Sequence, residues 1–157
     1  EGIKYSDTKI VGWTHADLQI TRQSIQNSLH QIQTLFNEDC EDFFIKGVRN
    51  GRKISEKIFS YLMALIASFA HKENFKDING QPTFFNKNLI SDLNDINIPK
   101  DFNIDFYIYY IAIKNNIKIF RTQTQFINRK YGESKWNTNI ISKISFMVST
   151  FRYIIEV

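Results

Sequence analysis

The stretch Lys9-Ile10-Val11-Gly12-Trp13-Thr14 is a short apolar run of strand-forming residues, and it ends at the polar cluster His15-Ala16-Asp17-Leu18-Gln19. Apolar residues at helical spacing follow Thr21, a residue type that suits a helix N-cap. A second apolar run, Phe43-Phe44-Ile45, comes next and ends at Lys46-Gly47. A strand, a helix and a strand with tight connections predict a unit of an α/β sheet, so the expected fold class is α/β.

The rest of the chain continues this alternation of helices and strands. The apolar spacing predicts helices at 58–70, 86–93, 107–114 and 139–155, and short strands at 117–121 and 125–128. Asn79-Gly80 is a turn signal between two of these segments. We find no internal repeat and no low-complexity tract, so we expect one continuous arrangement of helices around a sheet.

Length and composition predict a single globular domain over residues 1–157. Hydrophobic residues make up 43% of the 157 and charged residues 23%, which argues against disorder. Cys40 is the only cysteine, which excludes an intrachain disulfide and favours a reducing, cytoplasmic location. The most apolar run, Ile58–Ala70, is shorter than the ~20 residues that span a bilayer, so a buried helix is expected.

Positive charge is concentrated in the C-terminal part of the chain. The formal net charge is +4, and from Lys114 onward eight lysines and arginines stand against two acidic residues, a local net charge of +6. Such an excess favours an anionic partner, such as phosphate, nucleic acid or an acidic membrane surface. A solvated basic face explains the same charge, and both interpretations stay open.

His15, Asp17 and Gln19 are two positions apart and directly follow a predicted buried strand. In an extended segment they would point the same way, into the edge where open α/β sheets bind ligands. One carboxylate, an amide oxygen and an imidazole are a sparse set, but Mg²⁺ and Mn²⁺ complete their shells with substrate phosphates and water. The alternative is a polar loop in which Asp17 acts as a cap.

Two basic segments have the chemistry of phosphate binding. Arg129, Ser134 and Lys135 share one loop. A second basic cluster begins at the end of a predicted strand and consists of Lys46, Arg49 and Arg52. Arginine binds two phosphate oxygens at once, lysine adds a point charge, and serine donates a hydrogen bond. Two such loops suit a substrate with two phosphate-bearing parts, although RNA or plain solvent exposure would also suit them.

Further polar residues lie around two predicted turns. Asp105 lies near a predicted helix start, where it is either a cap favoured by the helix dipole or a general base. Asn79 and Gln81 alternate with Asp77 beside a proline, and their amides are suitable partners for sugar hydroxyls. Asparagine and aspartate are also common in turns for purely structural reasons.

Taken in order, five segments resemble motifs of glycosyltransferase family 2, with the closest similarity to the bacterial branch related to dolichyl-phosphate mannose synthase. The segments and the motifs they resemble are Trp13–Gln19 (D-A-D-L-Q), Phe44–Arg52 (V-K-G-x-R-x-x-R), Asp77–Phe85 (D-I-N-A-Q-P-K-L-F), Asp101–Asp105 (D-F-S-L-D) and Arg129–Trp136 (R-x-x-G-x-S-K). The five matches are collinear and cover nearly the whole chain.

The resemblance implies a GT-A-like fold, with a mostly parallel sheet flanked by helices and a bound Mg²⁺ or Mn²⁺. It implies a hexosyl transfer from a nucleotide-sugar donor to a polyprenyl-phosphate or glycan acceptor, with no nucleic acid partner. The implied roles are metal binding by Asp17, Gln19 and His15, catalysis or acceptor orientation by Asp105, phosphate binding by Arg49, Arg52, Arg129, Ser134 and Lys135, and a sugar or acceptor pocket at Asn79 and Gln81. His15 departs from the aspartate of the family motif.

Only 14 residues precede His15, so the resemblance implies the C-terminal two-thirds of a glycosyltransferase domain. We expect one partial domain over residues 1–157, with a metal motif at 13–19, an acceptor-side region at 77–105 and a phosphate loop at 129–136. Peripheral contact with the inner face of a membrane is a further expectation. Two alternatives stay open: a non-catalytic fragment that serves as an interaction module, and a basic RNA-binding domain.

Overall fold

A computed structural model describes residues 2–3, 5–90, 98–127 and 140–157, and its centre is a four-stranded sheet. The strands are β1 (Ile10–Trp13), β2 (Phe43–Asn50), β3 (Thr83–Asn86) and β4 (Lys118–Gln125), and their order across the sheet is β1-β3-β2-β4. β3 is antiparallel to both β1 and β2, whereas β2 and β4 are parallel. The protein is therefore α/β with an open, mixed sheet.

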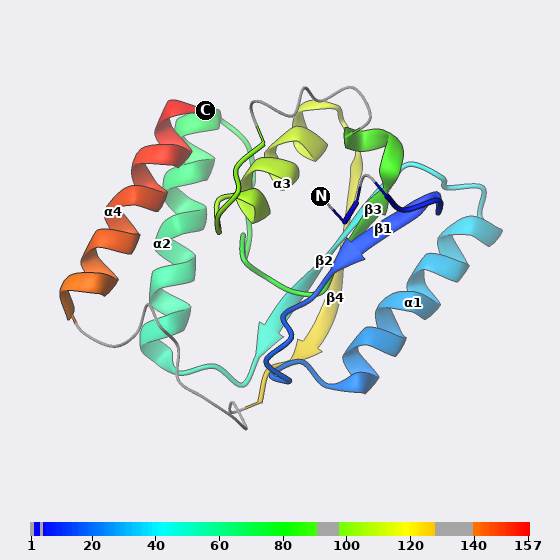
Figure 1. The fold of residues 1–157 in the computed structure, drawn as a ribbon, viewed down its shortest axis with the longest axis horizontal. Coiled ribbons are helices and arrows are strands. Elements are labelled where there is room, and N and C mark those ends of the chain that lie inside the picture. The colour runs from blue at the N-terminus through cyan, green and yellow to red at the C-terminus, as the bar shows by residue number, and fades with distance from the viewer. Residues whose placement is uncertain (1, 4, 91–97, 128–139) are drawn as a thin grey trace.

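Helices cover both faces of this sheet (Figure 1). They are α1 (Arg22–Asn37), α2 (Ile54–His71), the short 3-10 helix η1 (Lys87–Ile90), α3 (Ile104–Lys114) and α4 (Ile140–Glu156). α1 packs on one face, and α2, α3 and α4 lie on the other, with α2 and α4 side by side. This arrangement divides the apolar interior into two cores.

Side-chain alternation along β2 determines which core each residue enters. Phe43 and Ile45 face α1, where they pack against Ile32 and Leu35. Phe44 faces the opposite side and stacks between Phe85 of β3 and Tyr109 of α3, with ring centroids 5.7 and 5.6 Å away. This column of three rings holds α3 against the sheet.

The predicted helix after Thr21 is confirmed, and so are the first strand and the regions of α2, α3 and α4. Thr21 is the N-cap of α1, and its hydroxyl accepts a hydrogen bond from the Ser24 amide. The sequence predicts two strands, at 117–121 and 125–128. Within the described residues this prediction is wrong, because a single strand, β4, runs from Lys118 to Gln125. Eight-residue pairing with β2 stabilises its polar C-terminal half.

Three further predictions need correction. Asn86 ends β3 rather than starting a helix, and η1 is the only part of the predicted 86–93 helix within the described residues. The sheet is less parallel than expected because β3, which the sequence pattern does not reveal, runs against its neighbours. β2 also extends beyond its predicted end to Asn50, so Arg49 lies in a strand and not in a loop.

The helix predicted at 58–70 is only partly buried. Within α2, Met63, Ala64 and Ala67 enter the core, whereas several large apolar side chains on another face are exposed to solvent. In the part of the chain that the structure describes, no helix combines the length and the apolar character needed to cross a bilayer.

Two glycines allow the segment before β3 to cross β2 at close range. A Cβ atom on Gly47 would lie 2.0 Å from the carbonyl oxygen of Gln81, and one on Gly80 would lie 1.9 Å from the carbonyl oxygen of Gly47. Both obstacles are backbone atoms, which cannot rotate away as side chains do. The backbone of residues 80–81 therefore rests directly on β2, and this contact places the Gln81 side chain.

We predict that Gly47→Ala lowers the free energy of unfolding by about 2 kcal/mol or more, because the added methyl group must push the 80–81 backbone off β2. Chemical denaturation monitored by circular dichroism measures the change. Gly2→Ala is the matched control, since a Cβ there would have no atom within 4 Å and should leave stability unchanged. Equal stability of the two variants would contradict the close crossing.

Candidate active site at one edge of the sheet

Polar segments gather at the edge of the sheet where β1, β2 and β4 end and β3 begins. The amide of Ile127 donates to the carbonyl of Gln19 at 2.8 Å, and the amide of Phe126 donates to the carbonyl of Asn50 at 2.9 Å. These bonds join the segments that follow β1, β2 and β4. The carboxyl ends of parallel strands are the usual ligand-binding edge of open α/β sheets.

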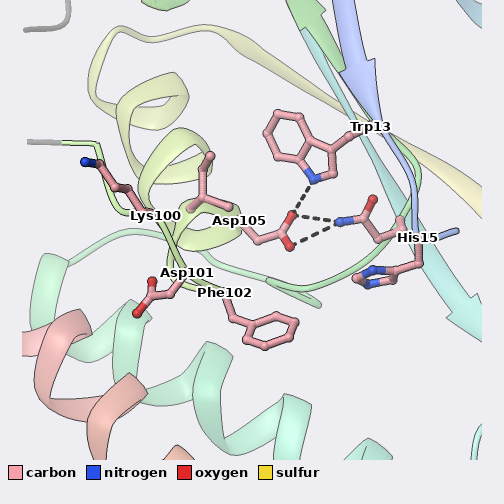
Figure 2. A pocket seen from close by; sticks show the side chains of 8 residues that line it. Trp13, His15, Lys100, Asp101, Phe102 and Asp105 are labelled. Atoms are coloured by element: carbon pink, nitrogen blue, oxygen red, sulfur yellow. Dashed lines mark hydrogen bonds between the residues drawn. The ribbon is translucent and has the colours of Figure 1, made fainter. Parts of the chain in front are cut away.

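A pocket of about 360 Å³ opens at this edge (Figure 2). It is lined by Trp13, His15, Gln81, Lys100, Asp101, Phe102, Ile104 and Asp105. Its volume lies within the range of small-molecule sites, and it combines aromatic rings with a few convergent polar groups. In Figure 2 the Asp105 carboxylate points toward the indole of Trp13.

Asp105 lies at the centre of a hydrogen-bond network. Its Oδ1 accepts from Trp13 Nε1 at 3.2 Å, from Lys46 Nζ at 3.2 Å and from Gln81 Nε2 at 2.9 Å. Its Oδ2 accepts from Gln81 Nε2 at 3.1 Å. The residue lies in the first turn of α3, where the helix dipole favours a negative charge. The network fixes the orientation of the carboxylate at the pocket.

Lys46 is the counter-ion of this carboxylate, and its side chain is 0% exposed. Nζ also donates to Thr83 Oγ1 at 3.0 Å, so β2, β3 and α3 meet at one ammonium group. Burial lowers the pKa of Lys46, while the charge and the hydrogen bond of Asp105 act in the opposite direction. The pair therefore places two mutually dependent charges in the interior.

Trp13 is a site residue for which the sequence analysis gives no role, and the contacts of Lys46 differ from the expected ones. The sequence groups Lys46 with Arg49 and Arg52 as a phosphate-binding cluster, whereas in the structure Lys46 pairs with Asp105. The available signal was its position two residues after Phe44, because that spacing puts both side chains on the same buried face. A lysine at such a position requires a buried acceptor.

Gln81 contributes a second feature of the pocket. Its side chain is buried, its Nε2 is committed to Asp105, and its Oε1 has no hydrogen-bond partner among the described residues. A buried acceptor without a donor is unfavourable. The amide is thus oriented by the carboxylate, and its oxygen retains hydrogen-bonding capacity beside the pocket.

The three predicted metal ligands have different surroundings. His15 lines the pocket, whereas Asp17 Oδ1 accepts from the Gln19 amide at 3.2 Å, and Gln19 Nε2 donates to the Ile127 carbonyl at 3.2 Å. The segment is a turn rather than an extended strand. Across the described residues, no group of three His, Cys, Asp or Glu side chains is arranged to hold a metal ion.

The side chains of His15, Asp17 and Gln19 are few ligands for a permanently bound metal ion. They are better suited to an ion that binds together with a phosphate-bearing substrate. Asp17 is the one carboxylate of the three residues, and magnesium sites with few protein ligands complete their shell with phosphate and water. Metal binding at His15, Asp17 and Gln19 stays a prediction.

Arg49 and Arg52 share one carboxylate. Arg49 Nη2 lies 2.5 Å from Asp77 Oδ1, the Arg49 backbone amide donates to Oδ2 at 3.0 Å, and Arg52 Nη2 lies 3.5 Å from Oδ1. Ser60 of α2 accepts from Arg52 Nη1 at 2.7 Å. Two cations and one anion leave a net positive charge, and Arg52 Nε is buried without a hydrogen-bond partner among the described residues.

The surroundings of Asp77 change its acidity. Burial alone would raise the pKa of Asp77, but the charges of Arg49 and Arg52 and the hydrogen bonds from Arg49 outweigh burial and bring the pKa below its ordinary value. Burial and then the like charge of Arg49 lower the pKa of Arg52. The cluster holds the segment before β3 against β2 and α2.

The other predicted residues divide into two groups. Asn79 makes a long contact of 3.9 Å from Nδ2 to Met63 Sδ and is not among the residues that line the pocket. Arg129, Ser134 and Lys135 lie outside the described residues, so their phosphate-binding roles stay predictions. The structure describes the chain before this loop as far as Ile127, whose backbone amide donates to the carbonyl of Gln19.

We predict that Asp77→Asn lowers the free energy of unfolding at pH 7 by about 3 kcal/mol, because it leaves two buried cations without their counter-ion. The folded-state pKa of Asp77 is below its ordinary value of 3.8. Its contribution is therefore present above that pH and is lost as the pH falls through the folded-state pKa. Denaturation of both proteins from pH 7 to pH 2 should show the difference shrinking at low pH.

Asp42→Asn is the control for this series, because Asp42 is exposed at the opposite end of β2. Its unfolding curve should match that of the wild-type protein across the same pH range. A difference between wild type and Asp77→Asn that stays constant down to pH 2 would refute the assigned ion cluster.

Comparison with known proteins assigns no family to this chain. No family model matches it, and no curated protein matches it.

Proposed function

We propose that this protein is a glycosyltransferase with a GT-A-like domain, which transfers a sugar from a nucleotide-sugar donor to a lipid-phosphate or saccharide acceptor. The observation that carries the proposal is the convergence of distant segments on one carboxylate. Trp13, Lys46 and Gln81 all donate to Asp105, and these four residues belong to four of the five segments that resemble family motifs. The convergence brings four of these segments, which are far apart along the chain, together beside a single pocket.

The sheet is compatible with this fold assignment. β1, β2 and β4 share one direction, and a GT-A-like domain is expected to be mostly parallel. The pocket lies at their carboxyl ends, where nucleotide-binding sheets take their ligands. The antiparallel β3 delivers Gln81 to that edge, since Gln81 lies two residues before its first residue.

Asp105 is the acceptor-side residue of the proposed reaction. Its Oδ1 accepts three described donors and its Oδ2 accepts one, so Oδ2 has the larger remaining capacity for a substrate proton. With a hydroxyl acceptor, Asp105 takes the proton as the oxygen attacks the anomeric carbon. With a phosphate acceptor, the attacking oxygen is already ionised, and Asp105 orients the sugar.

The pocket wall contributes binding rather than proton transfer. Trp13 and Phe102 supply aromatic surface, and the Gln81 amide supplies hydrogen bonds of the kind that sugar hydroxyls need. Lys46 has no direct access to solvent and acts by holding Asp105 in position. We therefore assign Lys46 as a positioning residue and not as a catalytic one.

On the donor side, negative charge develops on the leaving diphosphate. Asp17 is the residue that would hold Mg²⁺ or Mn²⁺, whose contribution is to neutralise that charge. The motif resemblance adds Arg129, Ser134 and Lys135 as phosphate ligands. Arg49 and Arg52 carry the net positive charge left by Asp77 and are suited to the phosphate of a lipid acceptor.

We predict that Asp105→Asn lowers turnover by roughly 100-fold or more, because the amide keeps the shape of the side chain but cannot accept a proton or carry its charge. Turnover is measured on the full native protein, as nucleotide released from a panel of nucleotide sugars with Mg²⁺ or Mn²⁺. Asp42→Asn changes an exposed carboxylate far from the pocket and should retain wild-type turnover.

Two results would contradict the proposal. If the wild-type protein releases nucleotide from no donor but keeps its fold, a non-catalytic interaction module becomes the better assignment. If it binds RNA with strong salt dependence and Asp105→Asn binds equally well, the RNA-binding alternative is favoured.

We predict separately that Asp17→Ala lowers metal-dependent turnover by roughly 100-fold, because it removes the one carboxylate of the predicted metal segment. Calorimetry supplies the second measurement. Mn²⁺ alone should bind the wild-type protein weakly, and its affinity should rise when a nucleoside diphosphate is present, since phosphate oxygens complete the shell. Tight Mn²⁺ binding without nucleotide, unchanged by Asp17→Ala, would show that the metal is held elsewhere.

A further inference from the structure

α2 has an apolar face that points away from the core. Phe69 is 88% exposed, Ile54 77% and Tyr61 67%. Six exposed apolar residues recur at intervals of one to four positions, namely Ile54, Ile58, Tyr61, Leu62, Leu65 and Phe69. At 3.6 residues per turn these positions form one stripe along the helix. The residues that α2 buries, such as Met63 and Ala67, lie on a different side.

α4 extends this surface. Its exposed apolar residues are Ile144, Val148 and Ile155, which are spaced by four and seven positions and therefore share one side. The two helices meet where Phe59 packs against Phe151, with ring centroids 6.1 Å apart. Phe59 directly follows Ile58, and Phe151 lies three residues after Val148. The two stripes therefore lie on neighbouring helices that pack directly against each other.

The exposed charges of α2 and its two cap residues are positive, whereas on α4 the exposed Arg152 and Glu156 pair with each other and add no net charge. Lys53 and Lys57 at the start of α2 and Lys72 at its end are exposed. Lys57 lies three residues after Ile54 and four before Tyr61, so it borders the stripe directly. Glu56 lies two positions from Ile54 and from Ile58, which turns it to another side of the helix, and it is partly buried. An apolar face bordered by lysines complements an anionic, amphipathic surface.

We propose that the outer face of α2 and α4 docks onto the surface of a bilayer that contains anionic lipids. Exposed Phe, Tyr, Leu and Ile on one side and flanking lysines are the composition of interfacial helices, which insert apolar side chains below the headgroups and pair their cations with lipid phosphate. A second copy of the chain is a poorer occupant. Symmetric pairing of α2 would bring lysine-bordered faces together, with Glu56 turned away from the contact.

α4 also contacts a residue of the pocket, through a side chain on a different side of the helix from its exposed stripe. Phe102, which lines the pocket and is 51% exposed, packs edge-on against Phe146 of α4 with ring centroids 5.5 Å apart. Phe146 lies two positions after Ile144 and two before Val148, so this contact is on the side of α4 away from the stripe. Docking through the stripe does not depend on the proposed glycosyl transfer.

Vesicle sedimentation tests the proposal on the full native protein without any nucleotide sugar. The probes are vesicles of phosphatidylcholine alone and vesicles that also contain about 30% phosphatidylglycerol, which gives their surface a negative charge. We expect binding to the anionic vesicles to be stronger by roughly tenfold and to weaken as salt is raised. The double variant Leu65→Ser, Phe69→Ser should bind these vesicles roughly tenfold more weakly.

Leu29→Ser is the matched control, because Leu29 is an equally exposed leucine on α1, on the other face of the sheet. It should bind vesicles as the wild-type protein does, and circular dichroism should show that all variants remain folded. The proposal is overturned if the wild-type protein ignores anionic vesicles, or if Leu29→Ser loses as much binding as the double variant. It is also overturned if light scattering shows that the wild-type protein is a dimer and the double variant is a monomer, since a second copy of the chain then covers the face.

Discussion

The ion pair between Lys46 and Asp105 connects β2 to α3 in the interior of the protein. Removing both charges from water is costly, and the cost is offset only if both groups keep their partners and good geometry. Thr83, Gln81 and Trp13 supply those partners, and they come from β3, from the segment before it and from β1. The pair therefore constrains three strands and a helix at once, and the pocket forms where these elements meet.

A second buried cluster acts on the other end of the same segment. Asp77 binds Arg49 and Arg52, while four residues later Gln81 binds Asp105. Between them, Gly80 lies directly on Gly47 of β2. The segment is thus held at both ends by charge and in the middle by backbone contact. This explains how a turn without regular secondary structure presents a side chain with the precision that a binding site needs.

The sequence predicts local features of the fold well and non-local ones poorly. Thr21 and the residues after it contain all the information that a capped helix requires, and α1 forms as predicted. β3 has four residues and gains its stability from pairing with β1 and β2, so its own sequence gives little signal. Asp105 was identified from its place near a helix start, but its partner Lys46 is 59 positions away along the chain. Pairing at that separation is set by the strand order, which no local pattern encodes.

α2 illustrates how one helix serves stability and recognition with separate faces. Met63, Ala64 and Ala67 secure it against the core, so its outer stripe is free of packing constraints and can remain apolar without loss of fold. Ser60, near the start of the same helix, accepts hydrogen bonds from Arg49 and Arg52. The helix that carries the proposed membrane face is thereby bonded to the cluster that positions the segment bearing Gln81. These contacts are partly buried hydrogen bonds from two arginines, so they connect the position of α2 to that of the segment that delivers Gln81 to the pocket.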